Sequence, residues 1–229
     1  MRVPVPLYGV LSVPFRLFGI RPSRMNPNTC TACELMFKTL MKARKITIDA
    51  TVMFIDLRGY TNLSRSQSPD AVSGLLDTFY DECAEAIWDH DGLLNKTLGD
   101  AIMAVFNFPI RQPDHVRQAV LAAREIQRRC RDKRDELVRT FGLGASDFGV
   151  GIGIDTGELS FGEFGRSHRD LTAIGTVVNT ASRTQSVAEA GQILVTRSVH
   201  DRAASEFEDS PVHVYRLKGY DAPIELYGA

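Results

Sequence analysis

The stretch LLNKTLGDAIMAVF, residues 93–106, decides how the fold is read. It contains two short apolar runs, and the tight-turn sequence TLGD joins them as a hairpin. Upstream, the run ATVMFI at residues 50–55 is rich in apolar and β-branched side chains, which favours a buried strand. Residues 69–88, between this strand and the hairpin, have the pattern of a helix, with Ser68 as its cap before a proline. The main domain therefore starts as strand, helix and hairpin.

The rest of the chain continues this alternation of helices and strands. Residues 112–139 carry a long, charged, amphipathic pattern that is typical of a helix. The elements predicted after it are a second hairpin with strands at residues 148–155 and 159–161 and its turn at Thr156 and Gly157, a helix at residues 175–189, and strands at residues 193–196, 214–217 and 224–227. The order β-α-β-β-α-β predicts an α+β domain of the ferredoxin-like, split βαβ type.

Length and charge limit the classes of protein that fit. The 229 residues suffice for one compact domain and a short appendage. The 27 basic and 28 acidic side chains leave a net charge of -1, which gives no reason to expect a nucleic-acid partner. A change in composition near residue 45 divides the chain into an N-terminal arm, residues 1–45, and a main domain, residues 46–229. We expect the arm to be regulatory or dimer-forming.

The arm begins with an apolar stretch and ends in a predicted helix at residues 29–45. Residues 1–20 contain prolines and arginine, lack a small-residue cleavage site and are too interrupted to span a bilayer, so we expect a cytoplasmic protein. Apolar side chains interleaved with arginines leave two interpretations open. The arm lies at a membrane surface as in a peripheral protein, or it packs on the arm of a second copy; we favour the second copy.

Four cysteines, Cys30, Cys33, Cys83 and Cys130, are too few and too scattered for a secreted disulfide scaffold. Cys30 and Cys33 form a CxxC pair, which is half of a four-thiolate set. Two copies in a homodimer could build a zinc or iron–sulfur site from them. The simpler interpretation is a reduced pair at the start of a helix, and the metal or redox site is the alternative.

Two aspartates lie where the first strand and the hairpin turn are expected to meet. Asp56 ends the first strand, and Asp100 lies at the tip of the hairpin. In a split βαβ sheet these elements are neighbours, so both carboxylates reach one end of the sheet. Carboxylates without His or Cys companions suit Mg²⁺ or Mn²⁺, and two such ions can activate a hydroxyl and neutralise a leaving pyrophosphate. Taken alone, aspartates at strand ends are more often turn residues or caps.

Other polar side chains give little indication of function when each is taken alone. Asn179 and Arg183 lie four residues apart in a predicted helix and therefore project from one face. An arginine beside an amide can stabilise charge on a pentacoordinate phosphate, although such a pair taken alone is more often part of a solvated helix face. Lys96, Thr172 and Lys218 are common residue types in unremarkable positions.

The order of several segments is far more specific than any one residue. The segments are VMFIDLRGYT at 52–61, LNKTLGDAIMAVF at 94–106, GIGIDTG at 151–157, TAIGTVVNTASR at 172–183 and YRLKGY at 215–220. In this order they resemble the catalytic domain of the class III adenylyl and guanylyl cyclases over about residues 47–227. Leu171 and Thr184 depart from that pattern, where the family usually has an aromatic and an aliphatic residue.

The resemblance implies a role for each matched residue. Asp56 and Asp100 match the two metal-binding aspartates, and Leu57 matches a position whose backbone carbonyl also contacts metal. Lys96 and Thr172 match the pair that reads the purine edge. Lysine with threonine at these positions goes with adenine and resembles a subclass common in bacteria.

The same resemblance assigns the remaining cationic and amide groups. Asn179 and Arg183 match the pair that stabilises the transition state, and Lys218 matches the lysine that holds the β- and γ-phosphates. The reaction so implied is attack of the ribose 3′-hydroxyl of ATP on the α-phosphorus, with two divalent metal ions and loss of pyrophosphate.

The family resemblance also implies a homodimer. In this family the active site lies between two domains, of which one supplies the aspartates and the other the base-reading and transition-state residues. Because this chain contains both sets, we expect two copies to form two equivalent sites. The alternatives are a cyclase for GTP, CTP or UTP and a catalytically silent nucleotide-binding signalling module.

Overall fold

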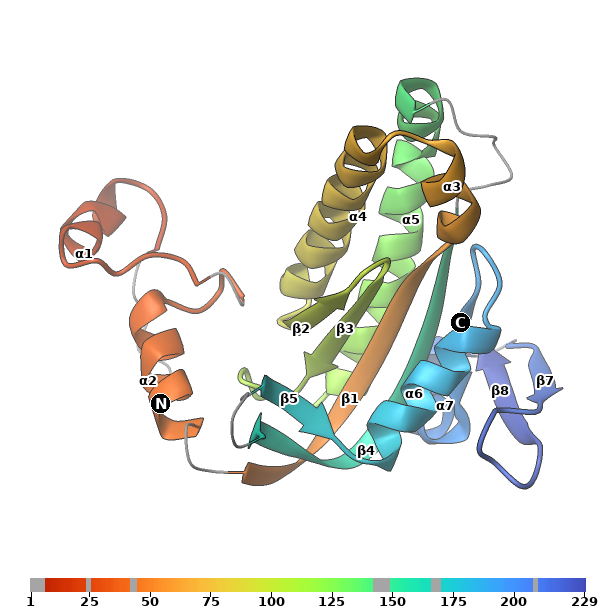
Figure 1. Cartoon of the computed structure of the whole chain (residues 1–229). Coiled ribbons are helices and arrows are strands. Elements are labelled where there is room, and N and C mark those ends of the chain that lie inside the picture. Colours follow the sequence, from red (N-terminus) through yellow and green to blue (C-terminus); the bar gives the residue numbers. More distant parts are fainter. Residues whose placement is uncertain (1–6, 24–25, 42–44, 142–148, 166–169, 208–209) are drawn as a thin grey trace.

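The computed structural model of the chain describes residues 7–23, 26–41, 45–141, 149–165, 170–207 and 210–229. Its centre is one eight-stranded sheet in the order β2-β3-β1-β4-β6-β8-β7, with β5 paired to β4. The strands are β1 (Lys45–Arg58), β2 (Leu93–Leu98), β3 (Ala101–Phe106), β4 (Gly149–Phe164), β5 (Asp170–Ile174), β6 (Ile193–Thr196), β7 (Val212–Tyr215) and β8 (Ile224–Gly228). Helices lie against both faces of this sheet (Figure 1).

The helices divide between the arm and the main domain. Those of the arm are the 3₁₀ turn η1 (Val10–Ser12), α1 (Val13–Leu17) and α2 (Thr31–Met41). Those of the main domain are α3 (Tyr60–Ser66), α4 (Pro69–Asp89), α5 (His115–Phe141), α6 (Thr176–Val187), α7 (Arg197–Arg202) and the 3₁₀ turn η2 (Ala204–Glu206). Among the helices of the described residues, none combines the length and the apolar character that crossing a membrane requires.

The ferredoxin-like prediction is confirmed by the connection of the first four sheet strands. The chain runs β1-α4-β2-β3-α5-β4, while the spatial order is β2-β3-β1-β4. Strand β1 pairs antiparallel with both β3 and β4. The predicted cap of α4 is also present, since the Ser68 hydroxyl accepts the Ala71 N–H at 3.3 Å.

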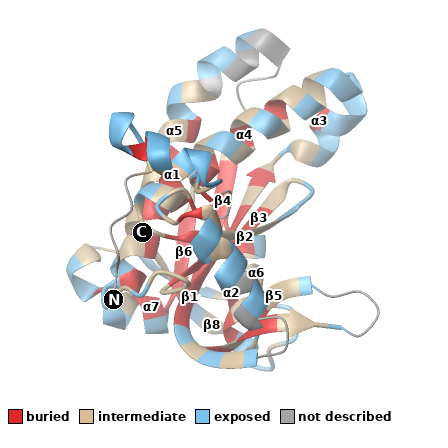
Figure 2. Cartoon of the chain, turned by 90° about the vertical axis from the view of Figure 1, so that its left-hand side faces the viewer, coloured by how far each residue is buried: buried red, intermediate tan, exposed pale blue. Residues whose placement is uncertain are grey.

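Strand β1 is the central strand, and its alternating side chains fill two separate cores. Met53 and Ile55 pack with α4 and α5 on one face of the sheet. Val52 and Phe54 pack with α6 on the other face. Figure 2 shows the buried residues concentrated on these central strands. The strand is longer than the predicted residues 50–55 because its first residues, from Lys45, alternate in exposure and leave no apolar run to recognise.

The predicted second hairpin is wrong. Thr156 and Gly157 do not turn the chain but pair with Thr51 and Ala50 of β1, inside the single long strand β4. Gly157 is explained by packing, because a Cβ at this residue would lie 3.1 Å from the Val177 side chain of α6. The sequence Thr-Gly is typical of a turn, but here the glycine leaves room for α6 to pack on the sheet. Residue 148, included in the predicted hairpin, lies outside the described residues.

Glycine also sets the distance between α6 and β4 at Gly153. A Cβ built there would lie 2.1 Å from the backbone nitrogen of Gln185 and 2.6 Å from the carbonyl oxygen of Ala181. Helix α6 therefore lies with its backbone directly on the strand, which only a residue without a side chain allows.

Three short helices and strands of the structure, α3, α7 and β5, were not predicted from the sequence. Helix α3 follows the left-handed Gly59, and neither α3 nor α7 has enough residues to show a helical period. Strand β5 is also new. The helix predicted over residues 29–45 is observed as α2, and residues 42–44 lie outside the described part of the chain.

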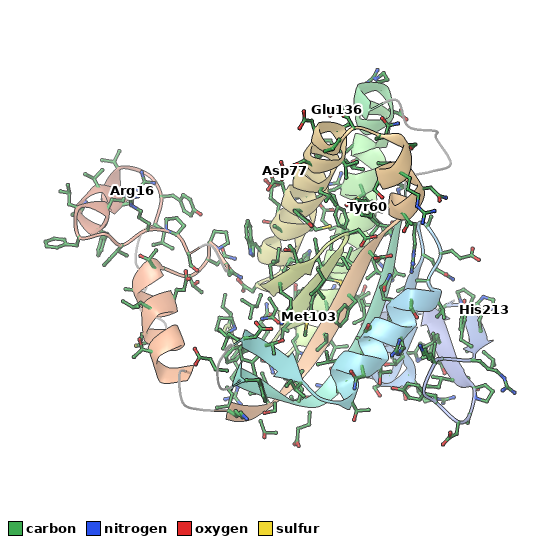
Figure 3. The ribbon with its side chains drawn as sticks, in the orientation of Figure 1. Arg16, Tyr60, Asp77, Met103, Glu136 and His213 are labelled. Atoms are coloured by element: carbon green, nitrogen blue, oxygen red, sulfur yellow. The ribbon has the colours of Figure 1, made fainter. Side chains whose placement is uncertain are left out.

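The arm is attached to the main domain by two asparagines. The Asn26 side chain donates to the Gly92 carbonyl at 2.8 Å, and the Asn28 side chain donates to the Trp88 carbonyl at 2.9 Å. Beyond this anchor, α1 and α2 stand away from the sheet, as does Arg16 on α1 (Figures 1 and 3). Large apolar side chains of the arm are exposed in the single chain, among them Leu17 and Phe18.

We predict that Gly153→Ala destabilises the fold. The new methyl group must displace the α6 backbone, and such overpacking costs about 1–3 kcal/mol in the free energy of unfolding. Urea unfolding measures this loss as a lower midpoint. The control Ser186→Ala changes an exposed residue of the same helix and should stay within about 0.5 kcal/mol of the unaltered protein. Equal midpoints for Gly153→Ala and the control would contradict the packing argument.

Candidate active site

Asp56 and Asp100 come together as the sequence predicted. Asp56 lies near the end of β1 opposite Ala101 of β3, directly after the hairpin turn that carries Asp100. The Leu57 N–H donates to the Asp100 carbonyl at 3.1 Å, which fixes the turn against the end of β1. Both aspartates are partly exposed, whereas the Leu57 side chain is buried. The metal role of the Leu57 carbonyl stays a prediction.

The environment of Asp56 disfavours its charge. Burial raises the pKa of the Asp56 carboxyl above its ordinary value, and the nearby charge of Asp100 raises it further. Arg58 acts in the opposite direction, with its Nη1 3.1 Å from Asp56 Oδ2. The Arg58 guanidinium also donates to the Gln185 carbonyl at the end of α6. One arginine therefore links the carboxylate to the helix that covers β1 and β4.

The donor set at this end of the sheet fits hard divalent cations. It consists of carboxylate oxygens from two residues whose charges repel each other, and a bound cation would relieve that repulsion. Among the described residues, no group of three or more His, Cys, Asp or Glu side chains is placed to hold a metal ion, so a tetrahedral nitrogen or sulfur site is not formed there within one chain. The residues present suit Mg²⁺ or Mn²⁺, with substrate phosphates as further ligands.

Lys96 and Thr172 are brought together although β2 and β5 are not paired in the sheet. The Lys96 ammonium forms an ion pair with Asp170, the first residue of β5. The Asn95 amide donates to the Leu171 carbonyl at 3.1 Å, and the Thr172 hydroxyl donates to Asn95 Oδ1 at 3.3 Å. Residues of β5, which pairs with β4, thus contact the side chains of β2, the edge strand of the sheet.

Asn179 and Arg183 lie on the exposed face of α6. The buried face of this helix carries Val177, Thr180, Ala181, Thr184 and Gln185. Asn179 and Arg183 are both exposed, as their spacing of four residues predicts for one helix face. Thr184 lies where the family usually has an aliphatic residue, and its buried hydroxyl has no hydrogen-bond partner within the described part of the chain.

Lys218 belongs to the same side of the molecule as α6. It is exposed in the loop between β7 and β8, next to the buried Leu217. The Tyr220 hydroxyl lies 2.5 Å from the Thr180 hydroxyl, so this loop is tied to α6 two residues beyond Lys218. His213 of β7, labelled in Figure 3, marks this outer end of the sheet.

Within one chain these groups do not converge on a single point. The side of α6 that reaches Asp56 carries Gln185, whose side-chain amide lies close to that carboxyl and helps to lower its pKa. Residues 183 and 185 are two positions apart on a helix, so Arg183 points to the opposite side, away from the sheet and from Asp56. The two aspartates and the α6 pair therefore face different directions.

Sequence reasoning missed three residues that shape this site, Arg58, Asn95 and Asp170. Arg58 and Asp170 each lie two residues from a predicted site residue in a strand, and the period of two places such pairs on one face. For Arg58 this period could have been used, by extending the first predicted strand past Asp56 to residue 58. Strand β5 itself was not predicted, so the approach of Asp170 to Lys96 was not visible.

Known proteins share this fold and sequence pattern. Residues 43–227 match the family described as the adenylate and guanylate cyclase catalytic domain. An adenylate cyclase of Anabaena cylindrica is 33% identical over 186 residues, which is 77% of this chain and 36% of that protein. The chain thus spans about a third of the length of this curated relative.

Two solved structures have the same architecture. The guanylyl cyclase Cya2 superposes with a TM-score of 0.74 at 27% identity, covering 80% of this chain and 92% of that chain. The adenylyl cyclase CyaB from P. aeruginosa gives a TM-score of 0.73 at 27% identity, covering 81% of this chain and 95% of that chain. With the sequence match over most of the chain, these likenesses lead to one conclusion: the chain belongs to the adenylate and guanylate cyclase catalytic domain family.

Proposed function

We propose that the chain converts ATP to 3′,5′-cyclic AMP and pyrophosphate at sites formed between two copies of itself. The observation that carries this proposal is the division of the polar groups described above. Asp56 and Asp100 meet at the end of β1, while Asn179 and Arg183 project from α6 away from them. A second copy is therefore needed to bring the α6 pair, Asn179 and Arg183, to the carboxylates.

Asp56, Asp100 and the Leu57 carbonyl would hold two divalent cations, which supply activation of the ribose 3′-hydroxyl and neutralisation of the leaving pyrophosphate. The raised pKa of Asp56 supports this role, because two neighbouring carboxylates are costly at a partly buried position and bound cations would offset that cost. In this proposal Arg58 holds the Asp56 side chain in place through its contact at 3.1 Å.

Lys96 and Thr172 would read the adenine base. The ammonium of Lys96 donates to the ring nitrogen N1, and the Thr172 hydroxyl accepts from the exocyclic amine. Asp170 and Asn95 hold these two groups next to each other. The ion pair with Asp170 holds the Lys96 ammonium beside β5, next to Thr172.

Arg183 would balance the charge that grows on the α-phosphoryl group, with Asn179 positioning the ribose beside it. A guanidinium suits this task because its planar donors match phosphate oxygens. Lys218 would hold the β- and γ-phosphates, and the link between Tyr220 and Thr180 keeps its loop next to α6. These three residues come from one copy and the aspartates from the other.

A cyclase for another purine nucleotide is the second candidate. The guanylyl cyclase Cya2 is as similar to this chain as the adenylyl cyclase CyaB, at 27% identity each. Overall likeness therefore does not separate the two substrates. The preference for ATP rests on Lys96 and Thr172 alone.

The purified chain should turn over ATP and leave GTP, CTP and UTP almost unchanged when each is supplied with Mn²⁺. Lys96→Met removes the donor to N1 but keeps the aliphatic stem, and we expect a loss of tenfold or more in kcat/KM for ATP, about 1.4 kcal/mol. Product analysis by chromatography measures each nucleotide separately. Preferential formation of cyclic GMP would replace the adenylate cyclase assignment by the guanylate one.

Asp56→Asn and Asp100→Asn should each lower kcat/KM by about a hundredfold or more, because a metal-held charge contributes several kcal/mol. Mn²⁺ binding, followed by electron paramagnetic resonance, should weaken in both variants. Glu136→Gln is the control, since Glu136 is an exposed carboxylate near the end of α5 (Figure 3) and its ion-pair partner is Lys133. Unchanged Mn²⁺ affinity in both aspartate variants would refute the metal assignment.

A further inference from the structure

The CxxC pair lies in a fixed position at the junction of the arm and the main domain. Cys30 precedes the first turn of α2, and its carbonyl accepts the Glu34 N–H at 2.9 Å. A β-bridge joins Pro22 to Cys30, closing the segment that carries Asn26 and Asn28. Because those asparagines bind the loop at the end of α4, the pair is fastened to the catalytic domain.

The two sulfur atoms are close enough to react with each other. The Cys30 and Cys33 Sγ atoms lie 3.2 Å apart, and the Cys33 N–H donates to Cys30 Sγ at 3.3 Å. Thiolates that share a tetrahedral zinc ion at 2.3 Å lie about 3.8 Å apart, so the pair is closer than zinc ligation requires. No further His, Cys, Asp or Glu completes a metal cluster with them among the described residues.

The two thiols differ in acidity and in access. Burial opposes ionisation of Cys30, but hydrogen bonds from the Cys33 amide and thiol and from the Ala32 amide outweigh it and lower the pKa of Cys30. The hydrogen bond to Cys30 raises the pKa of Cys33. Cys30 is only 7% exposed, whereas Cys33 is exposed at the surface of α2. Cys30 is thus the thiol that ionises more readily, and Cys33 is the sulfur that a reagent meets first.

We propose that Cys30 and Cys33 form a redox site, a dithiol that external low-molecular-mass disulfides such as glutathione disulfide convert to an intrachain disulfide. The proposal rests on the distance between the sulfur atoms, on the amide directed at Cys30 and on the exposure of Cys33. It does not depend on the nucleotide that the catalytic domain uses.

The reaction is a two-step thiol–disulfide exchange. Cys30 first loses its proton to water. Cys33 then passes its proton to the Cys30 thiolate as the Cys33 sulfur attacks one sulfur of the external disulfide, whose S–S bond breaks and releases the first thiolate. That thiolate takes the proton from Cys30, and the Cys30 sulfur then attacks Sγ of Cys33 and displaces the second thiolate. The second thiolate takes a proton from water. Two cysteine thiols are oxidised by two electrons, and one external disulfide is reduced to two thiols.

The other cysteines provide an internal reference. Cys83 is fully buried, and burial raises its pKa well above the ordinary value. Cys130 is 5% exposed in the same core cluster. Neither sulfur is accessible to an external disulfide in the folded chain.

The test exposes the full-length chain to a series of ratios of reduced to oxidised glutathione, blocks free thiols with N-ethylmaleimide and analyses tryptic peptides by mass spectrometry. The peptide with Cys30 and Cys33 should lose two hydrogens and take up no maleimide as the ratio becomes oxidising. Peptides with Cys83 and Cys130 should remain fully labelled once the protein is unfolded for blocking. Cys30→Ser should stop at a glutathione adduct on the exposed Cys33, and Cys33→Ser should acquire an adduct at Cys30 at least tenfold more slowly.

Three results would overturn the proposal, and none depends on cyclase activity. The first is a pair that stays reduced in glutathione disulfide alone. The second is an end product with separate glutathione adducts on both cysteines. The third is stoichiometric zinc or iron in the purified protein that is released when the two thiols are blocked, which would make the pair a metal site.

Discussion

The antiparallel pairing of β1 with β3 is the interaction on which the site depends. It sets Asp56 opposite Ala101, and the Leu57 N–H then reaches the Asp100 carbonyl at 3.1 Å. A shift of register by one residue would turn Asp56 toward the opposite face of the sheet and expose Met53 and Ile55. The burial of those side chains under α4 and α5 therefore holds the carboxylates in position. Burial of β1 thus stabilises the fold, and the same burial raises the pKa of Asp56.

The contact between α6 and β4 is the second constraint. Gly153 lets the helix backbone lie on the strand, and this fixes which residues of α6 face the sheet. Gln185 then faces Arg58 and Asp56, while Arg183 faces solvent. The polar groups of one chain thus lie in two separate sets, and in our proposal the set on α6 acts on the substrate held by the aspartates of a second copy. This division is the physical reason for proposing a homodimer.

Much of the fold and part of the site could be predicted from the sequence. The hairpin of residues 93–106 and the capped helix after Ser68 carry local signals, and their presence fixed the βαββαβ order. The approach of Asp56 to Asp100 followed from that topology. The continuous strand β4 did not, because a glycine needed for helix packing at Gly157 looks like a turn glycine in sequence. The ion pair between Lys96 and Asp170 joins β2 to β5, two strands that are not paired with each other. This contact between residues far apart in the chain leaves no local sequence pattern that would predict it.

The central claim is that each site takes its aspartates from one copy and its arginine from the other. The most direct measurement mixes two inactive variants, Asp56→Asn and Arg183→Ala, in equal amounts and follows cyclic nucleotide formation after subunit exchange. Half of the dimers are then mixed, and each contains one intact site of two, so activity should return to about a quarter of that of the unaltered protein. A mixture that forms mixed dimers, as seen by mass spectrometry, yet remains as inactive as its components would contradict the account.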